Sequence, residues 1–185
     1  FTDAQRIYLE FSEKDIDENI KLTGKELIIE ISTDYLESLE EIFRLQNPRQ
    51  IIVIASPKDA FVKSELEKFK RAIGKISPRI QAEYILDQTL EQTAQKLKNY
   101  SPNESAAFLL LPFCDSSGAE ILPGFLVPSL VQHSAIPMYA HYESGMGYGL
   151  IGGKLVSDEL VGQLLGKILL SPIHESRRLH ISPMR

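Results

Sequence analysis

Apolar, strand-like runs alternate with amphipathic helical periods along most of the chain. The clearest strand is the run IIVIA at residues 51–55, whose continuous apolar character is typical of a strand buried on both faces of a parallel sheet. The clearest helix is Ala60–Ile76, where Val62, Leu66 and Phe69 recur at helical spacing with lysine and glutamate opposite them. Because strands joined by helical crossovers form a mainly parallel sheet covered on both faces, the pattern predicts an α/β fold.

The same periodicities and the capping residues predict the other elements. Strands are expected at residues 6–11, 27–31, 80–86, 106–111, 137–140 and 149–153, with an edge strand at 178–181. Helices are expected at residues 12–24, 34–47, 89–100, 125–133 and 158–170. From residue 51 onward this order predicts a doubly wound, mainly parallel sheet of about five strands, with helices on both faces.

Length and charge exclude several classes of protein. The chain has 185 residues, enough for one good core or for one domain and part of another. Its net charge of −5 argues against a general nucleic-acid-binding protein, which would carry a basic stripe. No apolar run approaches the length that crosses a bilayer, so we expect no direct membrane insertion by this segment.

Polar and aromatic side chains follow three of the expected strands, at the point where each strand ends. Because the loops after parallel strands meet at one edge of the sheet, these side chains are expected to form a ligand-binding site there. The candidate ligand-binding residues are Ser56, Lys58, Phe113, Asp115, Ser116, His141, Tyr142 and Glu143.

No catalytic, metal or cofactor site is expected. Cys114 and His141 would lie at the same edge, but no third orienting group or oxyanion loop accompanies them. The other histidines show no metal-ligand spacing. Residues 147–152 match the pattern GxGxxG, yet no helix opens inside the glycines as a dinucleotide site requires. Gly152 and Gly153 are better explained by close approach of the backbone to a neighbouring strand.

Three stretches resemble a known family. They are residues 27–54 (LIIEISTDYLESLEEIFRLQNPRQIIVI), 109–118 (LLLPFCDSSG) and 146–155 (MGYGLIGGKL). They resemble the carboxyl-terminal lobe of type I periplasmic binding proteins. Within that family the sequence is similar to the substrate-binding-like sensor domains of bacterial histidine kinases and diguanylate cyclases, which are themselves related to ABC-transporter substrate-binding proteins.

The resemblance implies a periplasmic-binding-protein-like α/β lobe over residues 33–185. Residues 1–32 would then be an N-terminal segment, either the end of a missing lobe or a hinge. The implied function is that of an extracytoplasmic ligand-sensing domain in a membrane-bound signal-transduction protein. Its location would be periplasmic or extracytoplasmic, tethered to the inner membrane. The domain itself would not be an enzyme, although the full-length protein would carry a kinase or cyclase module.

The resemblance also implies roles for the loop residues. Phe113 and Tyr142 would enclose an apolar or ring-shaped small molecule of unknown identity, while Ser56, Lys58 and Asp115 would fix its polar groups. Ligand binding would signal by rearranging the lobes or the two copies of a dimer. It can do so only by its differential affinity for the two states.

Other functions stay open at this point. The main alternative is the solute-binding component of an ABC importer. A one-lobed enzyme or a purely dimerising module are further alternatives, whereas a receiver domain is disfavoured because Ser56-Pro57 stands where its acidic pair would be. Gly162 and Gly166 on the last helix fit either close packing on the sheet or contact with a second copy, so a homodimer is also open.

Overall fold

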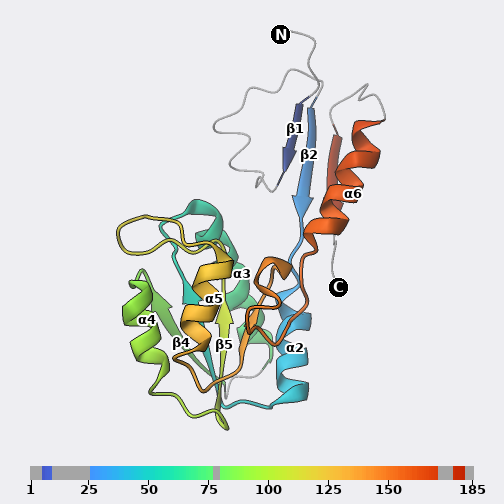
Figure 1. The fold of residues 1–185 in the computed structure, drawn as a ribbon. Coiled ribbons are helices and arrows are strands. Elements are labelled where there is room, and N and C mark those ends of the chain that lie inside the picture. The colour runs from blue at the N-terminus through green and yellow to red at the C-terminus, as the bar shows by residue number, and fades with distance from the viewer. Residues whose placement is uncertain (1–5, 10–25, 77–79, 171–176, 182–185) are drawn as a thin grey trace. The chain divides into compact units, whose positions relative to one another are not determined.

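The computed structural model describes residues 6–9, 26–76, 80–170 and 177–181. Its contacts divide the chain into two compact units (Figure 1). The larger unit is Asp34–Leu155, and the smaller unit combines Phe1–Thr33 with Val156–Arg185.

The larger unit is built on a four-stranded parallel sheet. Its strands are β3 (Gln50–Ala55), β4 (Gln81–Leu86), β5 (Ser105–Leu109) and β6 (Met138–Ala140), in the spatial order β4-β3-β5-β6. Strand β3 therefore pairs on both sides and is central in the sheet. Its uninterrupted apolar sequence is explained by the burial of both its faces. The strand order reverses between β3 and β5, so the topological switch point of the sheet lies there.

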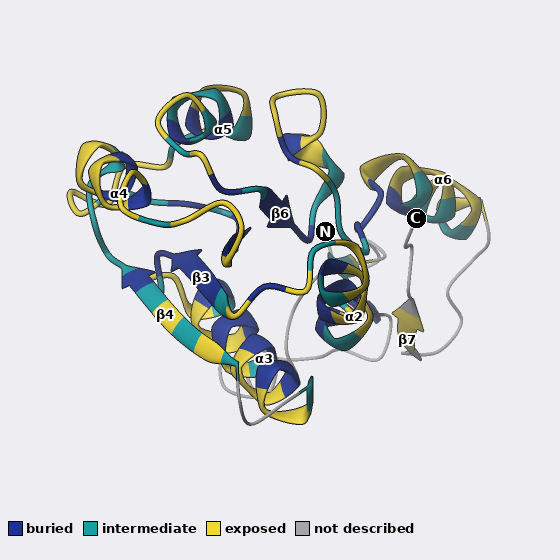
Figure 2. Cartoon of the chain, turned by 90° about the horizontal axis from the view of Figure 1, so that it is seen from below, coloured by how far each residue is buried: buried dark blue, intermediate teal, exposed yellow. Residues whose placement is uncertain are grey.

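Helices cover both faces of this sheet. The helices are α2 (Tyr35–Leu45), α3 (Ala60–Ile76), α4 (Leu90–Leu97) and α5 (Pro123–Val131). Helices α2 and α3 pack on the face that carries Val53, and α4 and α5 pack on the face that carries Ile52 and Ile54. Figure 2 shows the buried sides of these helices turned toward the strands between them. The predicted α/β class, the parallel strands and the two helical layers are confirmed.

Local sequence signals fix several helix ends. The Asp34 carboxylate accepts a hydrogen bond of 3.0 Å from the Glu37 N–H and caps α2. At α4 the Thr89 hydroxyl accepts from the Gln92 N–H at 3.1 Å, and the Gln92 side chain accepts from the Thr89 N–H at 3.0 Å. This is the capping box that the sequence predicted. The bounds of α3 also agree with the predicted ones.

The smaller unit contains a second parallel sheet. Its strands are β1 (Arg6–Leu9), β2 (Glu26–Ile31) and β7 (Arg177–Ile181), in the order β1-β2-β7. Its helix is α6 (Asp158–Leu169), which Ser157 caps by accepting a hydrogen bond of 3.4 Å from the Leu160 N–H. The strand predicted in the tail is present as β7, which is an edge strand of this second sheet and pairs with β2. The helix predicted at residues 12–24 lies outside the described residues.

The contacts divide the chain at two points, and the predicted division into residues 1–32 and 33–185 stays a prediction. The first boundary, at Thr33, nearly coincides with the predicted one. The contacts then group Val156–Arg185 with Phe1–Thr33, whereas the sequence analysis kept residues 33–185 in one lobe. The physical reason for this grouping is the parallel pairing of β7 with β2, which joins residues far apart in the sequence, such as Leu27 and Arg177.

The prediction of a fifth strand at residues 149–153 is wrong. This segment makes a single bridge, between Tyr139 and Gly152, supported by a hydrogen bond of 3.2 Å from the Ala140 N–H to the Gly152 carbonyl. Gly149, Gly152 and Gly153 have φ values of 115°, 150° and 142°, which lie outside the β region. The sheet of the larger unit therefore has four strands, with a glycine-rich chain passing along β6.

Gly153→Ala should destabilise the larger unit by about 2–4 kcal/mol, because it adds both backbone strain and steric overlap. A Cβ at this position would collide with the Ala140 carbonyl oxygen. The matched control is Gly74→Ala in α3, where an added Cβ meets no heavy atom within 4 Å and the unfolding free energy should rise by about 0.5–1 kcal/mol. Urea unfolding of both variants measures the difference; equal stabilities would contradict the close approach.

Candidate functional site

The loops after β3 and β5 leave the sheet on opposite sides of its switch point. In open α/β sheets this is where ligands bind, outside the carboxyl ends of the strands. The loop after β3 comprises residues 56–59, and the loop after β5 comprises residues 110–122. His141 follows β6 at the same edge. The fold therefore brings all three predicted loops to one edge of one sheet.

Two hydrogen bonds hold the loops after β3 and β5 together. The Ser56 hydroxyl donates to the Cys114 carbonyl, and the Lys58 ammonium donates to the Ser116 carbonyl at 2.8 Å. Ser56 is fully buried, so its hydroxyl serves this connection, whereas Lys58 and Ser116 are exposed. Of these residues, Lys58 and Ser116 are the ones that a ligand can reach without displacing the loops.

Asp115 organises its own loop. Its Oδ1 accepts hydrogen bonds from the Ser117 hydroxyl at 2.5 Å, the Ser117 N–H at 2.8 Å and the Ala119 N–H at 3.1 Å. These bonds, that of the Ser117 hydroxyl above all, hold the pKa of Asp115 below its ordinary value. Gly118, with φ of 88°, completes the tight turn. Asp115 is therefore a fixed negative charge at this edge.

Phe113 is a residue of the core, and the thiol of its neighbour Cys114 is not activated. Phe113 is 1% exposed and packs in the core between the sheet and helices α4 and α5. It cannot stack on a ligand unless it leaves that core. Burial raises the pKa of the Cys114 thiol, and the nearby carboxylates of Glu120, Asp59 and Asp115 raise it further. The thiol is therefore protonated at neutral pH and is not activated as a nucleophile.

His141 is the most unusual polar residue at this edge. It is 1% exposed and lies among aromatic rings, with centroid distances of 4.5 Å to Tyr142, 5.6 Å to Tyr35 and 6.4 Å to Phe108. Neither ring nitrogen makes a hydrogen bond within the described structure. Burial lowers the pKa of the imidazole to about 4, and the carboxylate of Glu65 opposes this only in part. His141 is therefore neutral at physiological pH.

The backbone near the end of β5 does not supply the missing partners of His141. Leu109 and Leu111 lie close enough that their backbone groups also raise the pKa of the imidazole. Neither meets the distance and angle of a hydrogen bond with the imidazole, and a buried interaction of this kind weakens steeply with misalignment.

A buried carboxylate next to this histidine was missed by the sequence analysis. Glu65 is 2% exposed, accepts a hydrogen bond of 2.5 Å from the Tyr35 hydroxyl, and forms an ion pair of 2.6 Å with Lys68. A signal was present in the sequence. Glu65 lies three residues after Val62 and four before Phe69, on the apolar stripe of α3, where an acidic side chain is buried with the stripe.

The predicted residues thus form two groups. Hydrogen bonds join the β3 and β5 loops through Ser56 and Lys58, and ring contacts join His141 to Tyr142. Tyr142 and Glu143 are half-buried, and Glu143 opens the short 3-10 helix η1 (Glu143–Gly145). Their assignment as ligand-binding residues stays a prediction.

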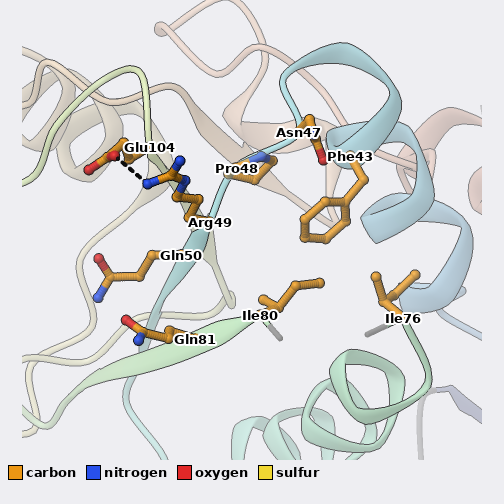
Figure 3. Close-up of a pocket in the computed structure, with 9 residues that line it drawn as sticks. All are labelled: Phe43, Asn47, Pro48, Arg49, Gln50, Ile76, Ile80, Gln81 and Glu104. Atoms are coloured by element: carbon orange, nitrogen blue, oxygen red, sulfur yellow. Dashed lines mark hydrogen bonds and ion pairs between the residues drawn. The ribbon is translucent and has the colours of Figure 1, made fainter. Parts of the chain in front are cut away.

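A pocket of about 580 Å³ lies at the opposite edge, where β3 and β4 begin (Figure 3). It is lined by Phe43, Asn47, Pro48, Arg49, Gln50, Ile76, Ile80, Gln81 and Glu104. Its one ion pair, between Arg49 and Glu104 at 3.2 Å, has side chains that are 84% and 55% exposed and is therefore screened by solvent. The carboxyl edge, which has the switch point and the buried polar groups, is the better candidate site.

Comparisons with known proteins support the fold. No protein-family model and no curated protein matches the sequence. Among solved structures, the chain is similar to an ABC domain from Streptococcus pneumoniae in complex with L-Trp, with a TM-score of 0.65 and 15% identity. That match covers all of this chain and 65% of the other. A conserved domain protein from Vibrio cholerae O1 biovar El Tor matches 86% of this chain, with a TM-score of 0.56 and 13% identity.

At 15% and 13% identity, these likenesses show a shared fold alone. The chain shares its α/β fold with the ABC domain from Streptococcus pneumoniae over its whole length. It spans about two thirds of the length of the first of these structures and 54% of the second. Within the part of the chain that the structure describes, none of the helices is both long and apolar enough to span a membrane.

Phe113→Ala should lower the free energy of unfolding by about 3–5 kcal/mol, because it leaves a cavity in the core. Phe125→Ala is the control: Phe125 is 65% exposed, and its truncation should change stability by less than about 0.5 kcal/mol. Urea unfolding of both variants measures the effect. If the two variants were equally stable, Phe113 would not be a core residue.

Stability should fall with acid because of His141. Between pH 6.5 and about 4 the unfolded chain takes up a proton that the folded imidazole does not, so unfolding becomes easier as pH falls. The loss should reach about 3 kcal/mol near pH 4 and then level off. It is measured as the difference between the pH profiles of the wild type and His141→Leu. The control variant His133→Gln changes an exposed histidine, and its free energy of unfolding should vary with pH as that of the wild type does. If the difference in unfolding free energy between the wild type and His141→Leu did not vary with pH, the imidazole of His141 would take up its proton in the folded protein.

Proposed function

We propose that this chain is a small-molecule-binding domain of the kind found in ABC-transporter substrate-binding proteins. The observation that supports this most is the fold likeness to the S. pneumoniae ABC domain over the whole of the chain, a domain whose structure contains L-Trp. The domain performs no chemistry of its own in this proposal. Its location would be extracytoplasmic, where such proteins collect their solutes.

The proposed ligand site is the carboxyl edge of β3, β5 and β6. Lys58 and Ser116 are exposed there, Asp115 is a fixed charge, and Tyr142 offers a half-buried ring. Ser56 and Phe113 would act indirectly, by holding the loops and the core in place. A few fixed polar groups beside an aromatic surface are the usual composition of a small-molecule site.

A sensor role is the second candidate. The resemblance of residues 109–118 and 146–155 to the sensor domains of histidine kinases and diguanylate cyclases favours it. In that case the same site would bind the ligand, and a rearrangement of the lobes or of a homodimer would pass the signal to a kinase or cyclase module. The two candidates differ in the rest of the protein, because an importer component has no cytoplasmic module.

A thermal-shift screen tests the proposed function. L-Tryptophan comes first, followed by other amino acids, nucleosides, sugars, organic acids and aromatic metabolites. A ligand at about 100 times its Kd should add about 2.7 kcal/mol to the stability, which is roughly 5–10 °C for a chain of this size. A flat response to the whole panel would contradict the proposal that this chain binds small molecules.

Variants locate the site once a ligand is found. Lys58→Ala and Tyr142→Ala should each weaken binding at least about tenfold, because each removes a group at the carboxyl edge. Arg49→Ala, in the pocket at the other edge, is the matched control and should leave the affinity unchanged. Isothermal titration measures all three. If Arg49→Ala weakened binding and the other two did not, the ligand would bind at the amino edge of the sheet.

A further inference from the structure

His141 carries two hydrogen-bonding atoms that the described structure leaves without partners. A buried polar group in this condition has lost its hydration and gained nothing in return, which is why such groups are rare in folded proteins. Leucine would fill a similar space at this position without that cost. The imidazole is therefore a candidate to receive a partner that the described chain does not itself supply.

The position of His141 indicates where that partner comes from. It is the first residue after β6, at the edge where the proposed ligand binds. Ala140, its neighbour, pairs with Leu109 at the end of β5, so His141 lies beside the start of the loop that carries Asp115. Of the three rings around the imidazole, those of Tyr35 and Phe108 are buried, whereas that of Tyr142, 4.5 Å away, is half-buried. A ligand that reaches His141 from the edge would therefore have to displace the Tyr142 ring.

The charges around His141 indicate which kind of partner fits. The carboxylate of Glu65 acts on the imidazole more strongly than the ammonium of Lys68 does. Among residues 56–59, 110–122 and 141–149, Lys58 is the one basic residue with a permanent charge, against Asp59, Asp115, Glu120 and Glu143. The carboxylates of Glu120, Asp59 and Asp115 all raise the pKa of the Cys114 thiol in the β5 loop, which shows that their negative charge is felt there. A negative field of this kind attracts a positively charged donor and repels a carboxylate.

We propose that the unprotonated nitrogen of His141 accepts a hydrogen bond from an amino group of the ligand, so that the ligand is an amine or an amino acid and not a simple organic acid. This inference rests on the proposed ligand-binding function and goes beyond it by naming the ligand class and the residue that selects it. The neutral imidazole is suited to this role, because a charged one would repel the ammonium group.

Matched probes test the ligand class. Three skeletons are each supplied as amine, amino acid and acid: tryptamine, L-tryptophan and indole-3-propionate; tyramine, L-tyrosine and 3-(4-hydroxyphenyl)propionate; isoamylamine, L-leucine and 4-methylpentanoate. For any skeleton that binds, the amine and the amino acid should bind at least about tenfold more tightly than the acid, as measured by isothermal titration. An acid that binds as tightly as its amine would overturn the inference.

Failure of the inference can be told apart from failure of the proposed function. If all nine probes fail while a sugar, nucleoside or organic acid from the wider screen binds, the protein is a ligand-binding domain but the amino-group inference is wrong. If nothing in either panel binds, both are wrong.

Variants of His141 test its role with two readouts of opposite sign. His141→Leu should raise the melting temperature of the ligand-free protein, because it removes a buried polar group without partners, and should weaken amine binding at least about tenfold. His141→Gln keeps an acceptor oxygen and should retain most of the affinity. His133→Gln is the control at an exposed histidine and should change neither readout. A His141→Leu variant that binds the amine as the wild type does would overturn the inference.

Discussion

The double-sided pairing of β3 is the constraint on which the larger unit depends. Ile51–Ile54 are completely buried, with alternate side chains supplying the two helical layers, and both strand edges are used by β4 and β5. From β3 the chain passes to β4 on one side, and it later returns to form β5 on the other side of β3. The connections that follow β3 and β5 therefore run in opposite directions and separate from each other. The separation places the ends of β3 and β5 at the switch point, and the polar loops that follow them are brought together there.

The polar side chains near that edge differ in whether they form hydrogen bonds. Ser56 and Glu65 are buried but fully engaged: the serine connects two loops, and the glutamate binds Tyr35 and Lys68. Asp115 likewise uses its carboxylate within its own turn. His141 is the exception, since it shares the burial of the others without their hydrogen bonds. This contrast with Ser56, Glu65 and Asp115 makes the imidazole a functional candidate.

Sequence reasoning succeeded where a signal is local. The apolar stripe of α3 predicted its bounds, and the Thr89–Gln92 pair predicted the start of α4. It failed where the outcome depends on a distant partner. Residues 149–153 look like a strand by composition, yet their glycines adopt positive φ and the segment passes along β6 with one bridge. The tail strand was predicted, but its partner β2 lies almost 150 residues away and no local pattern encodes that choice. Phe113 was assigned to the ligand because it ends a strand, and only the packing of α4 and α5 shows it to be a core residue.

The sequence by itself determined the α/β class, most of the strands and helices of the larger unit, and the edge at which the polar loops gather. These follow from periodicity, capping and the geometry of parallel sheets, all of which act over short distances along the chain. Only the tertiary structure decided how many strands each sheet has, which segments form each unit, and which loop residues are buried. Those properties depend on contacts between segments far apart in sequence, and the unsatisfied state of His141 became visible only when the surrounding rings were in place.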